Sequence, residues 1–204
     1  MIDKKTVKRR RYLFIDGTNL YAGQYDLLGP DKYLEFPKFI KKTEEKLSLK
    51  FDKIYFYASY SPFPKKPTEK QKKYLKNEAM FYKSVKKTEN LVFFKGYRSK
   101  TSGKEKQVDV KLTADIITYA FLNKYEEVFL MTGDADFIQA LFSVREFNHK
   151  KKISLICLEN KIMYQGLLFF QSYVLIFKKE PVFNRKFKNV KLIKINSEEL
   201  AQDI

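Results

Sequence analysis

Carboxylate side chains stand directly after apolar runs of the sequence, or open the segment that follows one, in three places: Asp16 with the amide of Asn19, Asp109, and Asp134 with Asp136. Carboxylates gathered in one place repel one another unless a cation is shared among them, and hard oxygen ligands are those that Mg²⁺ or Mn²⁺ binds. One or two such ions activate water and stabilise the leaving oxygen of a phosphodiester, and no histidine is needed. The pattern therefore predicts a metal-dependent phosphodiesterase.

Each of these acids also has a structural interpretation. Asp16 could belong to a turn, Asp134 could cap a helix, and Asp109 could stabilise a helix dipole. The joint placement after several strands favours the functional interpretation. Asp115 lies six residues after Asp109, so it points about 240° around a helix from it. We expect Asp115 either to bind a shared metal from one turn deeper or to be solvated.

Short apolar runs alternate with longer helix-like segments, which predicts an α/β fold with a mostly parallel sheet of about five strands and helices on both faces. The expected strands are Tyr12–Ile15, Lys53–Ala58, Leu91–Lys95, Glu127–Met131 and Ile153–Leu158. The expected helices are Phe36–Leu49, Thr68–Lys83, Val108–Leu122, Asp134–Phe147 and Met163–Phe170, and the segment Val182–Ile195 could add an edge strand. In such a sheet the carboxyl ends of the strands form the functional edge, where the acids are expected.

The composition excludes several classes of protein. One cysteine, Cys157, and one histidine, His149, exclude an internal disulfide framework, a pair of catalytic histidines and a cysteine/histidine zinc cluster within one chain. No glycine-rich phosphate loop can be written from the seven glycines. Neither a signal peptide nor a membrane-spanning segment is apparent, so we expect a soluble, cytoplasmic protein without a membrane partner.

Charge is strongly uneven along this basic chain, whose formal net charge is +17. Residues 38–111 hold 21 basic and 8 acidic residues, whereas residues 112–148 hold 2 basic and 6 acidic ones. A basic surface beside an acidic pocket suits a polyanion held next to divalent cations. The residues expected to hold a nucleic-acid backbone are Lys65, Lys66, Lys70, Lys73, Arg98, Lys100, Lys104 and Lys106.

Aromatic residues are interleaved with these lysines and arginines. Five of them could stack on unpaired bases: Tyr57, Tyr60, Phe63, Tyr74 and Tyr97. Stacking accepts any base and favours single strands. The alternative is that Tyr57 belongs to the core and that individual lysines are only solvated.

Three blocks of the sequence resemble those of the NYN domain, the LabA-like branch of the PIN-like nucleases. They are Phe14-Ile15-Asp16-Gly17-Thr18-Asn19-Leu20, Val108-Asp109-Val110-Lys111-Leu112 with Asp115, and Thr132-Gly133-Asp134-Ala135-Asp136-Phe137. The resemblance extends from about Tyr12 to Phe177. A late acidic block of the family is not matched, because this chain has Gln171-Ser172-Tyr173-Val174 there.

The resemblance implies a Rossmann-like PIN fold and a ribonuclease that uses Mg²⁺ or Mn²⁺. Asp16, Asp109, Asp134 and Asp136 match the family's acidic metal ligands, Asn19 matches its polar catalytic companion, and Asp115 matches a recurrent acid of the second block. We accordingly divide the chain into a basic tail (1–11), an NYN nuclease domain (12–178) and a C-terminal extension (179–204).

The leading hypothesis is an endonuclease that cleaves single-stranded regions of RNA. Two alternatives belong to other classes. One is an NYN-fold module that binds nucleic acid with weak or no catalysis. The other is a phosphatase of the haloacid dehalogenase type, which the order of elements disfavours because the Asp134-Ala135-Asp136 motif follows the fourth strand and not the first. The sequence does not decide whether the substrate is RNA or DNA, or whether the enzyme is an endonuclease or an exonuclease. It also leaves open the identity and number of the metal ions and whether the chain forms a homodimer through the apolar segment Leu167–Phe177.

Overall fold

The computed structural model describes residues 9–98 and 105–203. Its centre is a seven-stranded sheet in the order β10-β9-β8-β7-β1-β3-β4, in which every pair of neighbours is parallel. In that order the strands are Val190–Lys194, Gln171–Ile176, Lys152–Leu158, Glu127–Met131, Arg11–Asp16, Lys53–Ala58 and Leu91–Lys95. The mostly parallel α/β fold expected from the sequence is confirmed.

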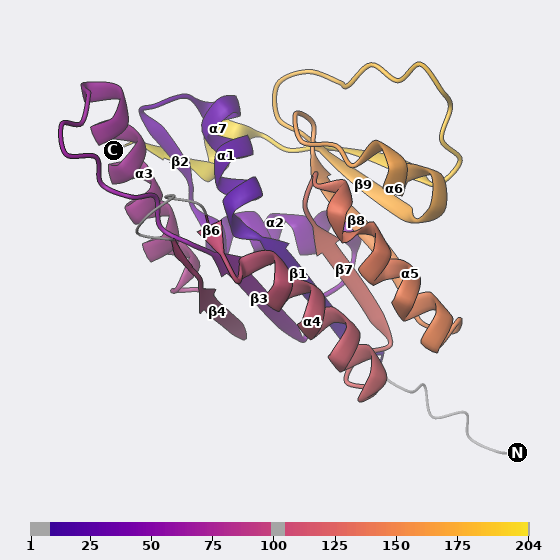
Figure 1. Cartoon of the computed structure of the whole chain (residues 1–204). Helices are drawn as coiled ribbons and strands as arrows, with labels where there is room; N and C mark the ends of the chain where they lie inside the picture. The colour runs from indigo at the N-terminus through magenta and orange to yellow at the C-terminus, as the bar shows by residue number, and fades with distance from the viewer. Residues whose placement is uncertain (1–8, 99–104, 204) are drawn as a thin grey trace, which may run out of the picture.

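Helices cover both faces of this sheet (Figure 1). One face packs against α1 (Gly17–Leu28), α2 (Phe36–Leu47) and α3 (Glu69–Val85), and the other against α4 (Val108–Phe121), α5 (Ile138–Phe147) and the short α6 (Tyr164–Phe169). Neighbouring residues of a strand point to opposite faces. In β1, Leu13 and Ile15 therefore enter the first core and Phe14 enters the second.

Strand β9 of the central sheet and helix α1 were not expected from the sequence. The sheet has seven strands and not about five, because β9 and β10 extend it beyond β8. Helix α1 follows β1 directly and was not expected, since its sequence contains Gly17, Asn19 and Gly23, which are weak helix formers. The expected edge strand in Val182–Ile195 is confirmed as β10.

Boundaries elsewhere shift by a few residues. The segment expected as one helix from Asp134 begins with a 3₁₀ turn, η1 (Ala135–Phe137), before α5. The final residues form α7 (Ser197–Leu200) and β11 (Ala201–Asp203), and β11 pairs antiparallel with β2 (Lys32–Leu34). Two further short strands, β5 (Tyr97–Arg98) and β6 (Glu105–Lys106), pair antiparallel. Within the described residues, no helix is both long and apolar enough to cross a bilayer.

Candidate metal and nucleic-acid site at the carboxyl edge

The carboxyl ends of β1 and β7 lie side by side, since the two strands are paired through Ile15 and Met131. Asp16 is the last residue of β1, and Thr132 directly follows β7. Their side chains join the two strand ends, because the Thr132 hydroxyl donates a hydrogen bond to Oδ2 of Asp16 over 3.0 Å. The same hydroxyl accepts the backbone N–H of Asp134 at 3.1 Å. Because Asp16 and Thr132 are both buried, this hydroxyl fixes the two acidic segments relative to each other.

Helix starts and backbone amides orient the remaining side chains of this edge. Asp16 caps α1, with Oδ1 accepting the backbone N–H of Asn19 at 3.0 Å. The Asn19 side chain in turn contacts the segment after β7, where its Oδ1 accepts the Gly133 N–H at 3.0 Å. Asp134 caps η1 by accepting the Asp136 N–H at 2.9 Å. The structural interpretation of Asp134 as a cap is therefore correct, and Asp16, for which a turn was the structural alternative, caps a helix as well. Both caps are compatible with a second role.

Two glycines allow this close approach. A Cβ atom at Gly17 would lie 2.1 Å from the ring of Phe56 in β3. A Cβ atom at Gly133 would lie 2.6 Å from the backbone oxygen of Lys161, in the turn after β8. Contacts this short do not occur between real atoms, so both positions require glycine for α1 and the Asp134 turn to sit where they do.

Asp115 lies in a separate set of contacts on α4. The Tyr57 hydroxyl donates to its Oδ2 at 2.8 Å, and the Lys111 ammonium, one turn earlier on α4, pairs with its Oδ1. Asp115 is buried, so the expectation that it could be solvated is wrong. Burial, together with the hydrogen bond to Asp115, raises the pKa of Tyr57. Tyr57 is the register partner of Asp16, so this set of contacts adjoins the edge.

Asp109 and Asp136 lie at the solvent side of the edge. Asp109 is exposed in the first turn of α4, as expected, and faces away from the buried Asp115. Asp136 is exposed in η1. The direct hydrogen bonds that span β1 and β7 thus involve Asp16, Asn19 and the Thr132–Asp134 segment, with Asp136 attached through its backbone.

The donor set at this edge is made of oxygen atoms. Mg²⁺ is commonly held by one or two carboxylates, with waters and substrate phosphate completing its octahedron. Asp16 and Asp134, which are linked through a single hydroxyl, fit that pattern. Among the described residues, no three carboxylate, imidazole or thiol groups stand close enough together to form a metal site by themselves. The remaining ligands would therefore come from solvent and substrate.

A basic and aromatic loop begins at the same edge. Residues 59–67 follow β3, and Ser61 is held by the buried Glu78, whose carboxylate accepts the Ser61 N–H at 2.8 Å and its hydroxyl at 2.7 Å. The loop presents Phe63, which is 74% exposed, next to the exposed Lys65 and Lys66. The anchored loop thus carries an accessible ring flanked by positive charge.

The other aromatic candidates divide by burial. Tyr57 is 1% exposed, so the interpretation as a core residue is correct. Tyr74 packs edge-on against Tyr21 and is half-buried. Tyr60 is half-buried with the Lys86 and Lys95 ammonium groups over its ring, whereas Tyr97 is 55% exposed.

The expected basic residues fall into two groups. Lys70 and Lys73 are exposed on α3, and Lys73 pairs with Asp31 at 2.9 Å. Of the second group, Lys100 and Lys104 lie outside the described residues. The backbone of Arg98 and Lys106 forms part of the β5 and β6 pair, which leads directly into the first turn of α4 and Asp109.

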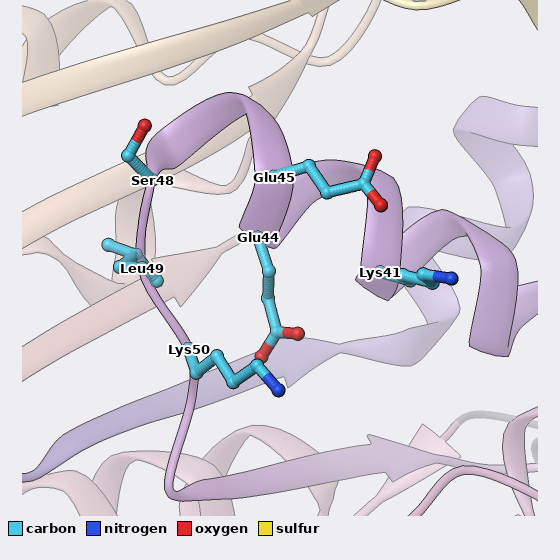
Figure 2. Close-up of a pocket in the computed structure, with 6 residues that line it drawn as sticks. All are labelled: Lys41, Glu44, Glu45, Ser48, Leu49 and Lys50. Atoms are coloured by element: carbon cyan, nitrogen blue, oxygen red, sulfur yellow. The ribbon is translucent and has the colours of Figure 1, made fainter.

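The opposite edge of the sheet has a different character. A cavity of about 540 Å³ lies where α2 ends and the chain turns toward β3 (Figure 2). It is lined by Lys41, Glu44, Glu45, Ser48, Leu49 and Lys50. Glu44 already accepts the backbone N–H of Phe51 at 2.7 Å. This cavity is remote along the strands from Asp16 and combines charges of both signs, so it does not belong to the acidic site.

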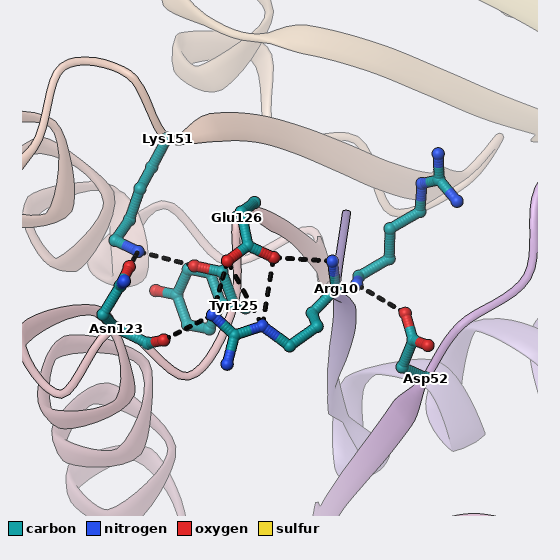
Figure 3. Close-up of polar contacts among 7 residues, drawn as sticks. Arg10, Asp52, Asn123, Tyr125, Glu126 and Lys151 are labelled. Carbon is teal, nitrogen blue, oxygen red and sulfur yellow. Dashed lines mark hydrogen bonds and ion pairs between the residues drawn. The ribbon is translucent and has the colours of Figure 1, made fainter. Parts of the chain in front are cut away.

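Ion pairs and hydrogen bonds connect the segments at this opposite edge, where the strands begin (Figure 3). The Arg10 guanidinium and backbone N–H both bind the Glu126 carboxylate, which joins the start of β1 to the turn before β7. The buried Lys151 ammonium donates to Asn123 Oδ1 at 2.9 Å and to the Tyr125 carbonyl. Burial lowers the pKa of Lys151. These contacts stabilise the sheet at the end away from the site.

Sequence reasoning missed two residues of the site. Thr132 joins Asp16 to the Asp134 turn, and Lys111 neutralises Asp115. Thr132 could have been identified from its position immediately after the apolar run of β7, because a residue there lies at the same edge of the sheet as Asp16. For Lys111 the signal was the four-residue spacing to Asp115, which puts the two side chains on one face of a helix.

Comparisons with known proteins show the fold and the family of this chain. The crystal structure of a protein of unknown function, VPA0982, from Vibrio parahaemolyticus, superposes with a TM-score of 0.60 at 16% identity. The alignment covers 86% of this chain and 96% of that one. This likeness shows the fold. No curated protein matches the chain. The family model of the NYN domain matches residues 10–165, well over half of the sequence. The chain therefore belongs to the NYN domain family, within the PIN-like nuclease superfamily.

Proposed function

We propose that the protein is a metal-dependent ribonuclease that cleaves single-stranded regions of RNA endonucleolytically, with Mg²⁺ or Mn²⁺ as the cofactor. The observation that carries the proposal is the hydrogen-bonded junction of Asp16, Thr132 and Asp134 at the carboxyl edge. The NYN domain implies a PIN-like nuclease, and such nucleases generally use divalent metals.

Asp16 and Asp134 would hold the ion, which supplies activated water and neutralises charge on the phosphate when bound. Thr132 donates a hydrogen bond to the Asp16 carboxylate, which fixes its orientation. Asn19 holds the Asp134 turn through its bond from Gly133. Asp109 and Asp136, exposed at the rim, add negative charge where hydrated cations approach.

Substrate binding would use the surface beside these acids. Lys65, Lys66 and Lys70 attract the phosphate backbone, and Phe63 offers an exposed face to an unpaired base. Stacking needs a base that has left the duplex, so an accessible ring near the acids favours single strands.

Asparagine substitutions test the catalytic part of the proposal. Asp16→Asn and Asp134→Asn remove the metal-binding charge, while asparagine remains a good helix cap. We expect both variants to fold, to bind RNA with an unchanged dependence on salt, and to lose cleavage of labelled single-stranded RNA in Mn²⁺ or Mg²⁺. Single-stranded DNA and duplex RNA, assayed in parallel, identify the preferred substrate. Tight binding by the unmodified protein without cleavage in any metal would support the binding-module alternative.

An alanine substitution tests the stacking part. Phe63→Ala should weaken binding of single-stranded RNA by roughly 5- to 160-fold, since one stacked base contributes about 1–3 kcal/mol. The control is Val182→Ala, because Val182 is 84% exposed but lies in the segment between β9 and β10. Equal RNA binding by both variants would show that Phe63 does not contribute to RNA binding.

A further inference from the structure

The outer face of α4 is uncharged over three turns. Val110, Ala114, Thr118 and Phe121 follow one another at helical spacing and are all exposed, and Val110 and Phe121 are each 73% exposed. Between Lys111 and Lys124 the charged residue is Asp115, which is buried against Tyr57. Such a face is unusual in a chain of which 32% of residues are charged.

Helix α5 widens this face. It packs beside α4 on the same side of the sheet (Figure 1). Its Phe147 is 56% exposed and meets the Phe121 ring edge-on, with the centroids 6.1 Å apart. At about 200 Å² for each phenylalanine, the exposed parts of these two rings amount to roughly 260 Å². That is about a third of the area that each partner buries in a standard interface.

Charge indicates which partner fits this face. Two copies of a chain with a net charge of +17 repel one another over most of their surface. Helices α4 and α5 together carry three acidic residues, Asp109, Asp115 and Glu146, and two basic ones, Lys111 and Arg145. This face is therefore nearly neutral, and a second copy meets less repulsion there than over the rest of this basic chain.

We propose that the α4 face binds a second copy of this chain, with the two α4 helices antiparallel about a twofold axis. The pattern of α4 is self-complementary in that arrangement: Val110 meets Phe121 of the second copy at both ends. Ala114 and Thr118 near the centre let the helices approach to within 8–10 Å. The same pairing brings Asp109 in the first turn toward Lys124 of the second copy.

The other exposed apolar surface suits a second copy less well. Tyr164, Leu168 and Phe169 are about half-exposed on α6. They adjoin residues 178–191, which hold six basic residues and one acidic residue, so two copies meeting there would bring like charges together. This segment overlaps Leu167–Phe177, which the sequence left open as a dimer interface. Most of that stretch is core, since Leu167, Phe170, Val174 and Leu175 are buried.

Sedimentation velocity of the full-length protein tests assembly independently of any catalytic activity. We expect a concentration-dependent dimer that Phe121→Glu shifts to monomer, because it places two carboxylates in the interface. Leu168→Glu on α6 is the matched control and should leave the dimer intact. A monomer at every concentration, or dissociation by Leu168→Glu alone, overturns the proposal. Circular dichroism of each variant shows that the loss of dimer is not unfolding.

Cysteine crosslinking tests the geometry. Ala114→Cys places a thiol near the proposed axis, and a short bismaleimide should then give a covalent dimer. Lys83→Cys, exposed on α3 on the other face of the sheet, should remain monomeric. The native Cys157 is buried and does not compete. Crosslinking by Lys83→Cys with none by Ala114→Cys contradicts the α4 interface.

Discussion

Replacement of Thr132 by valine removes the hydroxyl that joins the two acidic segments and keeps nearly the same shape. Two hydrogen bonds are lost: one donated to the Asp16 carboxylate at 3.0 Å and one accepted from the Asp134 N–H at 3.1 Å. A bond to a charged group contributes about 1.5–3 kcal/mol, and a neutral one about 0.5–1.5 kcal/mol. Thr132 is 3% exposed, so water does not replace the hydroxyl easily. We expect Thr132→Val to lower the free energy of unfolding by about 2–4.5 kcal/mol.

The chain offers a matched control for this substitution. Thr43 is fully buried in α2, and its hydroxyl donates to the Phe39 carbonyl at 2.8 Å, far from the acids. Thr43→Val should cost about 1 kcal/mol, because the lost bond is neutral and lies within a helix. Thr132→Ser keeps the hydroxyl and should retain most of the polar contribution.

Urea unfolding gives the stability of these variants, and cleavage of single-stranded RNA gives their activity. We expect Thr132→Val to lose both stability and most of the cleavage rate, and Thr43→Val to cleave as the unmodified protein does. Stability and cleavage unchanged in Thr132→Val would refute the reasoning, because the hydroxyl would then not position Asp16. A loss in Thr132→Ser with none in Thr132→Val would assign the effect to the methyl group.

Three further predictions concern buried or charged groups. Tyr57→Phe removes the hydrogen bond to buried Asp115 and should lower the free energy of unfolding by about 1.5–3 kcal/mol, measured by urea unfolding. Burial raises the pKa of the Cys157 thiol to about 11, so iodoacetamide should leave it unmodified at pH 8 in the native protein and modify it in urea, as mass spectrometry can show. The hydrogen bond from Arg10 lowers the pKa of Glu126; its contribution, below about 1 kcal/mol for a partly exposed pair, should be present above about pH 4.3 and disappear as the pH falls below the lowered pKa. Glu126→Gln should remove that part of the pH dependence of unfolding.

The positions of Asp16 and Asp134 could be predicted because buried parallel strands have a clear sequence pattern. The runs before these acids are nearly all apolar, and the residue after such a run must reach the carboxyl edge. The hydrogen bonds at that edge could not be predicted in the same way. They depend on the register between β1 and β7, which joins residues far apart in the sequence.

Helix α1 shows where local patterns fail. Its glycines disfavour a helix in isolation, yet packing against the sheet and the Asp16 cap hold the chain in that form. The environment of Asp115 is a similar case. Helical spacing correctly separates it from Asp109, but its burial depends on Tyr57, which comes from a strand 58 residues earlier.

The dependence of cleavage on Mn²⁺ tests the central claim most directly. The rate of cleavage of end-labelled single-stranded RNA is measured under single-turnover conditions over a range of Mn²⁺ concentrations and in EDTA, for the unmodified protein and for Asp134→Asn. We expect a saturable dependence on Mn²⁺, no cleavage in EDTA, and loss of cleavage in the folded variant. Cleavage that persists in EDTA, or that the folded Asp134→Asn variant retains in full, would contradict it.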